Sequence, residues 1–433
     1  MKTNSRRHFL KSVVAGSMVM LSGIPAKSWG ADAHVVVVGG GTAGATFAKY
    51  LKKADPSIRV TIIEKNATYH TCYMSNEVLG GGRELSSLAF TYDDLRRKYG
   101  IEVLIDEVTG LNSQAKIITT TGGANISYDR CVVAPGIGFR YDLIEGYDEN
   151  IAATSVHHAW KAGTQTTSLR NQLEAMDDGG TFVMAAPPNP YRCPPAPYER
   201  ASQVAHYFKK HKPASKILIL DPKSAFAKQP LFEEGWMELY GYGTNDSMIE
   251  RVSGADNLTT GLDVANKTAT TADGMIHQAD VLNIIPAQKA GTIAFAMNLT
   301  DDSGWCPINP ANFESTLISD VHVIGDASNA DPLPKSGFAA NSEAKACALA
   351  VSAMLNGRQP ERASFTNGCY SVVGDDYAIS IVAVYETADD GKSIQKITNA
   401  GGMSPIAASD DERKVDVQYA YSWYNNFTKD VFD

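Results

Sequence analysis

The sequence predicts an α/β protein with two Rossmann-like βαβ units and a C-terminal α+β region. Three patterns predict this fold: an apolar strand with a glycine-rich turn at 34–44, a strand–helix–strand pattern at 181–220, and a late apolar strand at 321–324 before an Ala-rich helix at 339–355. A chain of 433 residues suits two or three domains. The net charge of −9 argues against a nucleic-acid-binding protein, which needs a basic face to meet phosphates.

The first thirty residues predict an export signal rather than part of the folded domain. Ser5 to Lys11 resembles a twin-arginine motif, an apolar run from Val13 to Ile24 follows, and small residues lie near Ala26 to Ala31. A membrane anchor is the alternative, but this run is shorter than the ~20 residues that a spanning helix needs. We also expect no transmembrane segment later in the chain. The sequence therefore predicts a protein exported to the periplasm.

The N-terminal βαβ unit has the pattern of a dinucleotide-binding site. A strand at 34–38 and a helix at 45–53 enclose Gly39, Gly41 and Gly44, which have G-x-G-x-x-G spacing. In such a turn the glycines permit the tight bend, the approach of a pyrophosphate and close helix–strand packing, and the phosphate lies at the helix N-terminus. The next strand, 59–63, ends at Glu64, where an acid accepts a hydrogen bond from a ribose. A glycine-rich turn without a ligand is the alternative, but the ordered strand, helix and acid favour a nucleotide.

Two later motifs favour FAD over NAD as that nucleotide. Gly325 and Asp326 end the strand 321–324 and resemble the late Gly-Asp motif of FAD-binding disulfide oxidoreductases, whose Asp bonds the ribityl chain. Ala134-Pro135-Gly136, after the strand 130–134, resembles the Ala-Thr-Gly turn of the same family. Because Pro replaces Thr here, any bond from the Thr side chain is absent.

The second βαβ unit lacks a nucleotide fingerprint. A helical pattern covers 157–176, and then strand 181–186, a helix at 197–211 and strand 216–220 follow. The loop at 187–195 is rich in proline, which has no N–H to donate, and holds no glycine to admit a pyrophosphate. We expect no NAD(P)H site here, hairpins at 253–279 and another strand at 280–285.

The six cysteines include three that could carry chemistry. Cys193 in the proline-rich loop and Cys369 near the C-terminal region could form a redox disulfide, although composition alone favours unreactive buried cysteines. Glu199 could be a base near Cys193, or simply a carboxylate that complements a helix N-terminus. Cys72 could attach a flavin covalently or be an ordinary cysteine. No Cys-x-x-Cys-His or His cluster predicts a haem or metal site, and the packing cysteines are Cys131, Cys306 and Cys347.

From these residues the chain resembles the flavoprotein subunit of flavocytochrome c sulfide dehydrogenase, a protein of the FAD-dependent pyridine nucleotide-disulfide oxidoreductase type. The segments that carry the resemblance are Val35 to Gly44, Tyr69 to Leu79, Arg192 to Gln203, Gly304 to Pro307, Pro334 to Ser342 and Gln418 to Asn426. The resemblance implies that hydrosulfide is oxidised to sulfur or polysulfide, and that a dihaem c-type cytochrome subunit carries the haem and accepts the electrons.

The resemblance also implies roles for individual residues. Cys193 and Cys369 match the redox disulfide, Glu199 the catalytic base, Cys72 the covalent FAD attachment and Trp423 an active-site tryptophan. The full set expected to bind the cofactor is Gly39, Gly41, Thr42, Ala43, Gly44, Glu64, Lys65, Cys72, Ala134, Pro135, Gly136, Gly325, Asp326, Lys335, Ser336, Gly337 and Trp423.

Two other functions fit parts of the same pattern. A sulfide:quinone oxidoreductase shares the fold and the disulfide logic but needs a membrane-facing apolar surface and a quinone pocket. A non-catalytic flavin electron-transfer subunit would need no reactive disulfide. The expected domains are the signal at 1–30, an FAD-binding domain at 31–152 and 275–355, a second Rossmann-like domain at 153–274 and a C-terminal interface domain at 356–433.

Overall fold

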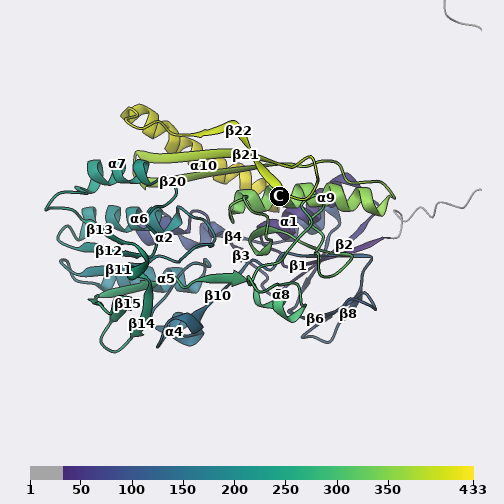
Figure 1. Ribbon diagram of the computed structural model, residues 1–433, viewed down its shortest axis with the longest axis horizontal. Coiled ribbons are helices and arrows are strands. Elements are labelled where there is room, and N and C mark those ends of the chain that lie inside the picture. Colours follow the sequence, from purple (N-terminus) through teal and green to yellow (C-terminus); the bar gives the residue numbers. More distant parts are fainter. Residues whose placement is uncertain (1–32) are drawn as a thin grey trace, which may run out of the picture.

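The computed structural model describes residues 33–433, so the predicted export signal lies outside the described residues (Figure 1). Its first sheet has five parallel strands in the order β19-β9-β1-β2-β5. These strands are β19 (Val321–Val323), β9 (Arg130–Val133), β1 (His34–Val38), β2 (Arg59–Glu64) and β5 (Glu102–Ile105). Val35 to Val38 are buried, as expected of a parallel strand that is covered on both faces.

Helix α1 (Thr42–Ala54) begins directly at the glycine-rich turn, three residues earlier than the sequence predicts, and packs against α9 (Gly337–Leu355). The other short elements of this half are α2 (Ser75–Gly80), α3 (Asp93–Tyr99), and the strand pair β3 (Tyr69–His70) and β4 (Ala89–Phe90). An antiparallel meander is formed by β6 (Val108–Asn112), β7 (Ile117–Thr120) and β8 (Asn125–Ser127).

The second half repeats this architecture around a four-stranded parallel sheet in the order β13-β12-β11-β17. Its strands are β13 (Ile249–Ser253), β12 (Lys216–Asp221), β11 (Thr181–Ala185) and β17 (Val281–Ile284), and its meander, where hairpins are predicted, is β14 (Thr259–Asp263), β15 (Thr268–Thr271) and β16 (Ile276–Gln278). Its helices are α4 (Glu149–Thr154), α5 (Thr164–Ala175), α6 (Ala196–His211) and α7 (Gln229–Tyr240). The antiparallel pair β10 (Ile137–Phe139) and β18 (Gln288–Ala290) crosses between the halves, and α8 (Thr292–Ala296) follows it.

The predicted helix at 157–176 is wrong over its first seven residues. Residues 157–160 have no regular secondary structure, residues 161–163 form a bend, and α5 begins only at Thr164. Buried polar contacts explain the difference, because the carbonyls of His157, His158 and Ala159 accept hydrogen bonds from Asn283 and the guanidinium of Arg200.

The C-terminal region adds an antiparallel sheet and a long helix across the two halves (Figure 1). These elements are β20 (Ser364–Gly374), β21 (Tyr377–Thr387), β22 (Ile394–Met403) and α10 (Asp410–Phe432). The apolar residues at 378–385 predict a strand, which lies within β21, whereas no helix is predicted for the aromatic-rich residues 419–427, which lie on α10. Ser409 and Glu412 form a capping box at the start of α10, and this S-x-x-E pattern is the signal that could have predicted the helix. The two-domain α/β fold with a C-terminal α+β region is confirmed.

Candidate active site

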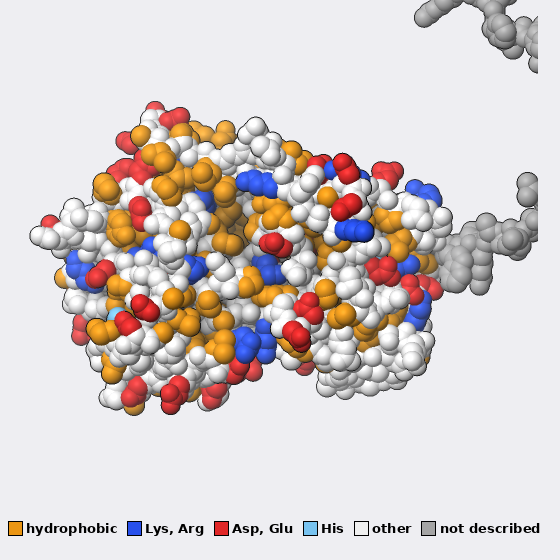
Figure 2. All heavy atoms as spheres, viewed as in Figure 1, with side chains coloured by type: hydrophobic (Ala, Val, Ile, Leu, Met, Phe, Trp, Pro, Cys, Tyr) orange, Lys and Arg blue, Asp and Glu red, His pale blue; other side chains and the backbone are white. Residues whose placement is uncertain are grey.

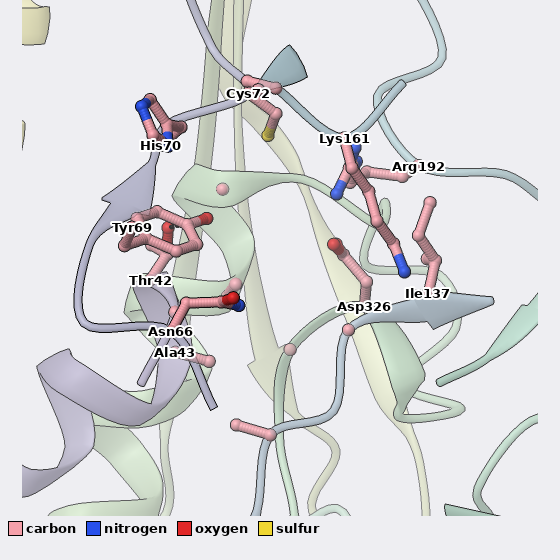
Figure 3. A pocket seen from close by; sticks show the side chains of 18 of the residues that line it. Thr42, Ala43, Asn66, Tyr69, His70, Cys72, Ile137, Lys161, Arg192 and Asp326 are labelled. Atoms are coloured by element: carbon pink, nitrogen blue, oxygen red, sulfur yellow. Dashed lines mark hydrogen bonds between the residues drawn. The ribbon is translucent and has the colours of Figure 1, made fainter. Parts of the chain in front are cut away.

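A cavity of about 720 Å³ lies at the carboxyl ends of the strands of the first sheet (Figure 3). This is the place where ligands bind in open α/β sheets, and the volume is within the range of small-molecule and cofactor sites. Its walls come from the glycine turn, the loop after β2, the turn after β9, and the Gly325–Asp326 turn after β19. Four segments that are distant in the sequence therefore form one elongated site.

The glycine turn is shaped so that a nucleotide backbone can approach α1. Gly39 has φ +97°, and a Cβ at Gly44 would lie 1.9 Å from the carbonyl oxygen of Gly39. A Cβ at Gly41 would lie 3.2 Å from the ring of Tyr69. Gly41 is the N-cap of α1 and offers no side-chain cap, so the first N–H groups of the helix are free to bind an anion. Thr42 and Ala43 line the cavity in this first turn.

Glu64 ends β2 at the cavity wall and holds the turn in place. Its Oε2 accepts a hydrogen bond from the backbone N–H of Gly40 at 2.8 Å, and its Oε1 accepts one from the N–H of Asn66 at 2.9 Å. Lys65 also lines the cavity, and its ammonium group pairs with Glu107 at 3.4 Å. Ala134, Pro135 and Gly136 form the opposite wall, with Gly136 at φ +62°.

Asp326 lines the cavity and has a carboxylate oxygen without a hydrogen-bond donor within residues 33–433. Its Oδ1 atom is buried and has no hydrogen-bond partner in the described chain. Burial raises the pKa of this carboxyl, although the nearby cations Arg192 and Lys335 act to lower it. Figure 3 shows the Asp326 side chain among the cavity residues, close to Lys161 and Arg192. Since buried polar atoms normally have partners, the hydroxyl of a bound ribityl chain fits this position.

The Gly325–Asp326 turn is supported from α9 and from the loop before it. Gly325 has φ +76° and donates its N–H to Oε2 of Glu343 at 2.8 Å, and burial raises the pKa of Glu343 to about 8. Lys335 donates to the carbonyl of Asp326 at 2.9 Å. Ser336 caps α9 through the N–H of Ala339 at 3.0 Å, and next to it Gly337 lines the cavity at the helix N-terminus.

Cys72 points its sulfur into this cavity from the loop after β3 (Figure 3). Burial raises the pKa of the Cys72 thiol, and Arg192 acts in the opposite direction. Together with Arg192 and Gly337, Cys72 also lines a second, smaller cavity of about 70 Å³. The two cavities are therefore neighbours that share a wall.

The second cavity brings together the two cysteines that composition alone favours as unreactive. Cys193 and Cys369, which are 176 residues apart (369 − 193), are free thiols in hydrogen-bonding contact at its wall. Cys193 has φ +57°, an uncommon conformation for a residue other than glycine, and donates its N–H to the carbonyl of Lys335 at 2.7 Å. The pair thus lies directly beside the larger cavity.

The environment makes the two thiols unequal. The hydrogen bond from Cys193, and then the charge of Lys228, lower the pKa of Cys369 to about 6 against the effect of burial. The same hydrogen bond and burial raise the pKa of Cys193. Cys369 is therefore the thiolate of the pair at neutral pH.

Glu199 and Trp423 complete the smaller cavity. Glu199 lies in the first turn of α6, and burial and the neighbouring Cys369 raise its pKa to about 7. Trp423 on α10 stacks on Phe338 with a centroid distance of 6.2 Å, and its Nε1 is buried without a partner. All three proposed catalytic groups and the tryptophan therefore contact one small space.

The acid at the corresponding strand end of the second half is bound by internal partners. Asp221 ends β12, where Glu64 ends β2, but it is fully buried by internal partners. It pairs with Lys223 at 2.7 Å and Arg251 at 2.8 Å and accepts a hydrogen bond from Tyr198 at 2.7 Å. The Asp221 carboxylate is therefore occupied by partners within the protein.

The sequence reasoning missed several cationic residues of the site. Lys161 and Arg192 line the larger cavity, and burial lowers the pKa of Lys161 to about 8. Lys228 contacts Cys369, and Arg200 is buried beside the smaller cavity. Arg192 adjoins Cys193, which is a signal the sequence offered; Lys161 and Lys228 offer none. The described residues contain no group of three His, Cys, Asp or Glu side chains placed to hold a metal ion.

Fold and site together define the class: a two-domain flavin-dependent disulfide oxidoreductase that binds FAD. Residues 33–174 match the pyridine nucleotide-disulphide oxidoreductase family. The fold is similar to the sulfide:quinone oxidoreductase of Aquifex aeolicus, with a TM-score of 0.69, 17% identity and 92% of each chain covered. It is also similar to an NAD-dependent persulfide reductase from A. fulgidus, with a TM-score of 0.61, 16% identity and coverage of 89% of this chain and 77% of that one.

The chain belongs to the family of flavocytochrome c sulfide dehydrogenase flavoprotein chains. Residues 166–286 match the central domain of that chain, and residues 361–432 match its flavin-binding domain. The flavoprotein chain from Chlorobaculum thiosulfatiphilum is 59% identical over 45 residues, which is 10% of this chain and 94% of that sequence. Mouse mitochondrial sulfide:quinone oxidoreductase is 26% identical over 319 residues, or 71% of this chain and 67% of that protein.

Proposed function

We propose that this chain oxidises hydrosulfide to sulfur or polysulfide through a redox disulfide between Cys193 and Cys369. The observation that carries the proposal is the contact of these two thiols at a small cavity that shares Cys72, Arg192 and Gly337 with the FAD cavity. Electrons released at the sulfur atoms therefore have a short path to the cofactor.

The first step is a thiol–disulfide exchange. Hydrosulfide attacks one sulfur of the disulfide, the S–S bond breaks, and one cysteine becomes a persulfide while the other leaves as a thiolate. The overall half-reaction is HS⁻ → S + H⁺ + 2e⁻, and in this proposal Glu199 takes the proton. FAD, when bound, supplies the chemistry of accepting an electron pair and passing the electrons on one at a time.

Cys193→Ser tests the disulfide. We expect sulfide-dependent bleaching of the flavin to fall to the background of the buffer, with the flavin spectrum intact. Cys131→Ala, which alters a fully buried cysteine of β9, is the matched control and should bleach normally. Unchanged bleaching in Cys193→Ser would favour the non-catalytic electron-transfer alternative.

We also propose that FAD is bound covalently through Cys72. The direction of the Cys72 sulfur into the FAD cavity supports this link (Figure 3). Denatured protein on a gel should show flavin fluorescence at acid pH, and Cys72→Ser should lose it while Cys131→Ala keeps it. A wild-type band without fluorescence would leave Cys72 as a packing residue.

The proposed electron acceptor is a dihaem c-type cytochrome subunit in the periplasm. Hydrophobic side chains gather on the face formed by α7 and the C-terminal sheet (Figure 2), and Met237, Met403 and Ile406 are each at least 60% exposed there. Such a patch is typical of a protein interface. In this proposal the predicted C-terminal domain, 356–433, carries the interface. The second Rossmann-like domain extends past its predicted end at 274, because β17 pairs with β11 in its sheet.

A quinone is the second candidate acceptor, because the chain is similar over most of its length to sulfide:quinone oxidoreductases. Within residues 33–433 no helix is both long enough and apolar enough to cross a bilayer. Sulfide-dependent reduction of a soluble c-type cytochrome, compared with reduction of a short-chain quinone, separates the two acceptors. Copurification of a haem protein would support the cytochrome.

A further inference from the structure

A buried lysine contacts the Cys369 sulfur from outside both cavities. The Nζ of Lys228 lies 3.7 Å from the Sγ of Cys369 and donates a hydrogen bond to the Oγ of Ser371 at 2.8 Å. The residue is only 4% exposed. It comes from the second half of the molecule, immediately before α7, whereas Cys369 lies on β20.

Lys228 has no carboxylate ion pair among the described residues. The ammonium group also donates a hydrogen bond to the carbonyl of Cys369 at 3.4 Å and lies 5.6 Å from the centre of the Phe232 ring. A buried ammonium group is costly to leave without a counter-charge. The anion that would balance this charge by direct contact is the Cys369 thiolate.

The backbone of Lys228 has an unusual conformation. Lys228 is the N-cap of α7 with φ +63°, a left-handed conformation that residues other than glycine seldom adopt. Cys193, which is hydrogen-bonded to Cys369, also has a positive φ, of +57°. Strain of this kind is held in place by the surrounding structure and is common at functional sites.

We propose that Lys228 is the group that stabilises Cys369 as the leaving thiolate, and that it thereby directs hydrosulfide to the sulfur of Cys193. This proposal rests on the proposed function above. In the step, HS⁻ forms a bond to the sulfur of Cys193, the Cys193–Cys369 bond breaks, and its electron pair stays on Cys369 beside the ammonium group. No proton or further reactant is needed. A better-stabilised thiolate is the better leaving group, so the persulfide forms on Cys193.

Two other titratable groups act on Cys369. Cys193 donates a hydrogen bond to it, and Glu199 faces it from α6 and opposes its negative charge. Neither group is a cation, so the removal of Lys228 removes the positive charge in contact with the sulfur.

The first experiment measures the thiolate without turnover. In the dithiothreitol-reduced protein, the alkylation rate of Cys369 by iodoacetamide is followed against pH by peptide mass spectrometry. We expect a midpoint near 6 in the wild type. Lys228→Met should raise that midpoint by about one unit or more, and Lys228→Arg should keep it close to the wild type.

Lys209→Met, which removes a lysine that donates to the carbonyl of Leu239, is the matched control and should leave the midpoint unchanged. An unchanged midpoint in a folded Lys228→Met protein, checked by circular dichroism, overturns the proposal.

The second experiment reads the direction of attack. Oxidised protein is treated with one equivalent of hydrosulfide and alkylated, and the persulfide adduct is located by mass spectrometry. We expect the adduct on Cys193 in the wild type and on both cysteines in Lys228→Met. An adduct mainly on Cys369 in the wild type contradicts the directing role of Lys228. Absence of any adduct in the wild type, with the alkylation midpoint still shifted by Lys228→Met, would instead count against the proposed sulfide oxidation.

Discussion

Glu199 accepts a hydrogen bond from the backbone N–H of Val372 at 3.0 Å, and this bond ties the helix that follows Cys193 to the strand that carries Cys369. Its other oxygen accepts a hydrogen bond from Asn76 at 3.0 Å, on the helix that follows Cys72. One carboxyl group therefore joins the three cysteine-bearing segments, and its protonation bears on the proposed chemistry.

The pH dependence of sulfide oxidation should follow Glu199. Burial and Cys369 raise its pKa from the ordinary 4.5 to about 7, so the basic carboxylate is present above pH 7 and is lost as the pH falls through that value. Because hydrosulfide is itself protonated in this pH range, the rate is expressed per concentration of HS⁻, and we expect this rate of flavin reduction to fall about tenfold per pH unit below 7. Glu199→Gln should lower the rate at pH 8 by about 10²–10⁴-fold and remove this acid limb. Stopped-flow absorbance measures the pH profile and the rate at pH 8. Glu174→Gln, which changes a half-exposed surface carboxylate, is the control. If the acid limb persists in Glu199→Gln, the limb belongs to a group other than Glu199.

Gly44→Ala should abolish FAD binding. The new Cβ would lie 1.9 Å from the carbonyl oxygen of Gly39, so the turn and the start of α1 must move apart. We expect the ratio of flavin to protein absorbance after purification to fall by about tenfold or more. Gly402→Ala on β22, where a Cβ meets nothing within 4 Å, should bind FAD normally. Full flavin content in Gly44→Ala would argue against a pyrophosphate at this turn.

Asp326→Ala should weaken FAD binding in a Cys72→Ser background, which removes the proposed covalent link that would mask affinity. The unpartnered Oδ1 is the acceptor that a cofactor hydroxyl would satisfy. A hydrogen bond to a charged group contributes about 1.5–3 kcal/mol, so we expect a Kd about 10–100-fold higher. Fluorescence titration of the apoprotein with FAD measures the change. Since Oδ1 of Asp326 is buried without a partner among the described residues, its removal costs no hydrogen bond from that atom in the apoprotein. The melting temperature of the Asp326→Ala/Cys72→Ser apoprotein should therefore be no lower than that of the Cys72→Ser apoprotein.

Asp221→Asn should destabilise the protein without changing its flavin spectrum. Although burial acts to raise the pKa of Asp221, Lys223, Tyr198 and Arg251 bring it below its ordinary 3.8. Breaking a buried ion pair costs about 3–5 kcal/mol, so the melting temperature should drop by several degrees, whereas exposed Asp246→Asn should not change it. The stabilising effect of the carboxylate is present above pH 3.8 and lost as the pH falls through the lower folded pKa. The difference between wild type and variant should therefore narrow in acid, and a difference independent of pH would exclude the ionic explanation.

The nucleotide-binding half was predictable because its signals are local or have a fixed order. Gly39, Gly41 and Gly44 are close in sequence, and Gly325–Asp326 ends a recognisable strand. The reactive pair was not predictable from the residues alone, because the contact between Cys193 and Cys369 depends on how β20 crosses α6. Only the resemblance to a family pointed to it.

The contact between Lys228 and Cys369 was not predictable from the sequence either. It is separated from Cys369 by 141 residues, and nothing in its neighbourhood marks a buried, unpaired lysine. Similarly, residues 157–163 are not helical because Arg200 and Asn283 bind their carbonyl groups, and no periodicity in the sequence reveals these contacts. In each case the tertiary contact decides what the local pattern leaves open.

The position of β19 in the first sheet affects the order in which the two halves of the protein can fold during synthesis. β1 ends at Val38, but its sheet lacks β19 until Val323 has been synthesised, and α9 follows later still. All four strands of the second sheet, by contrast, lie between Thr181 and Ile284. At a synthesis rate of about 5–20 residues per second, the N-terminal strand waits roughly 15–60 s for its last partner. The second half is therefore able to fold on the ribosome before the first, and the cofactor can enter only a nearly finished chain.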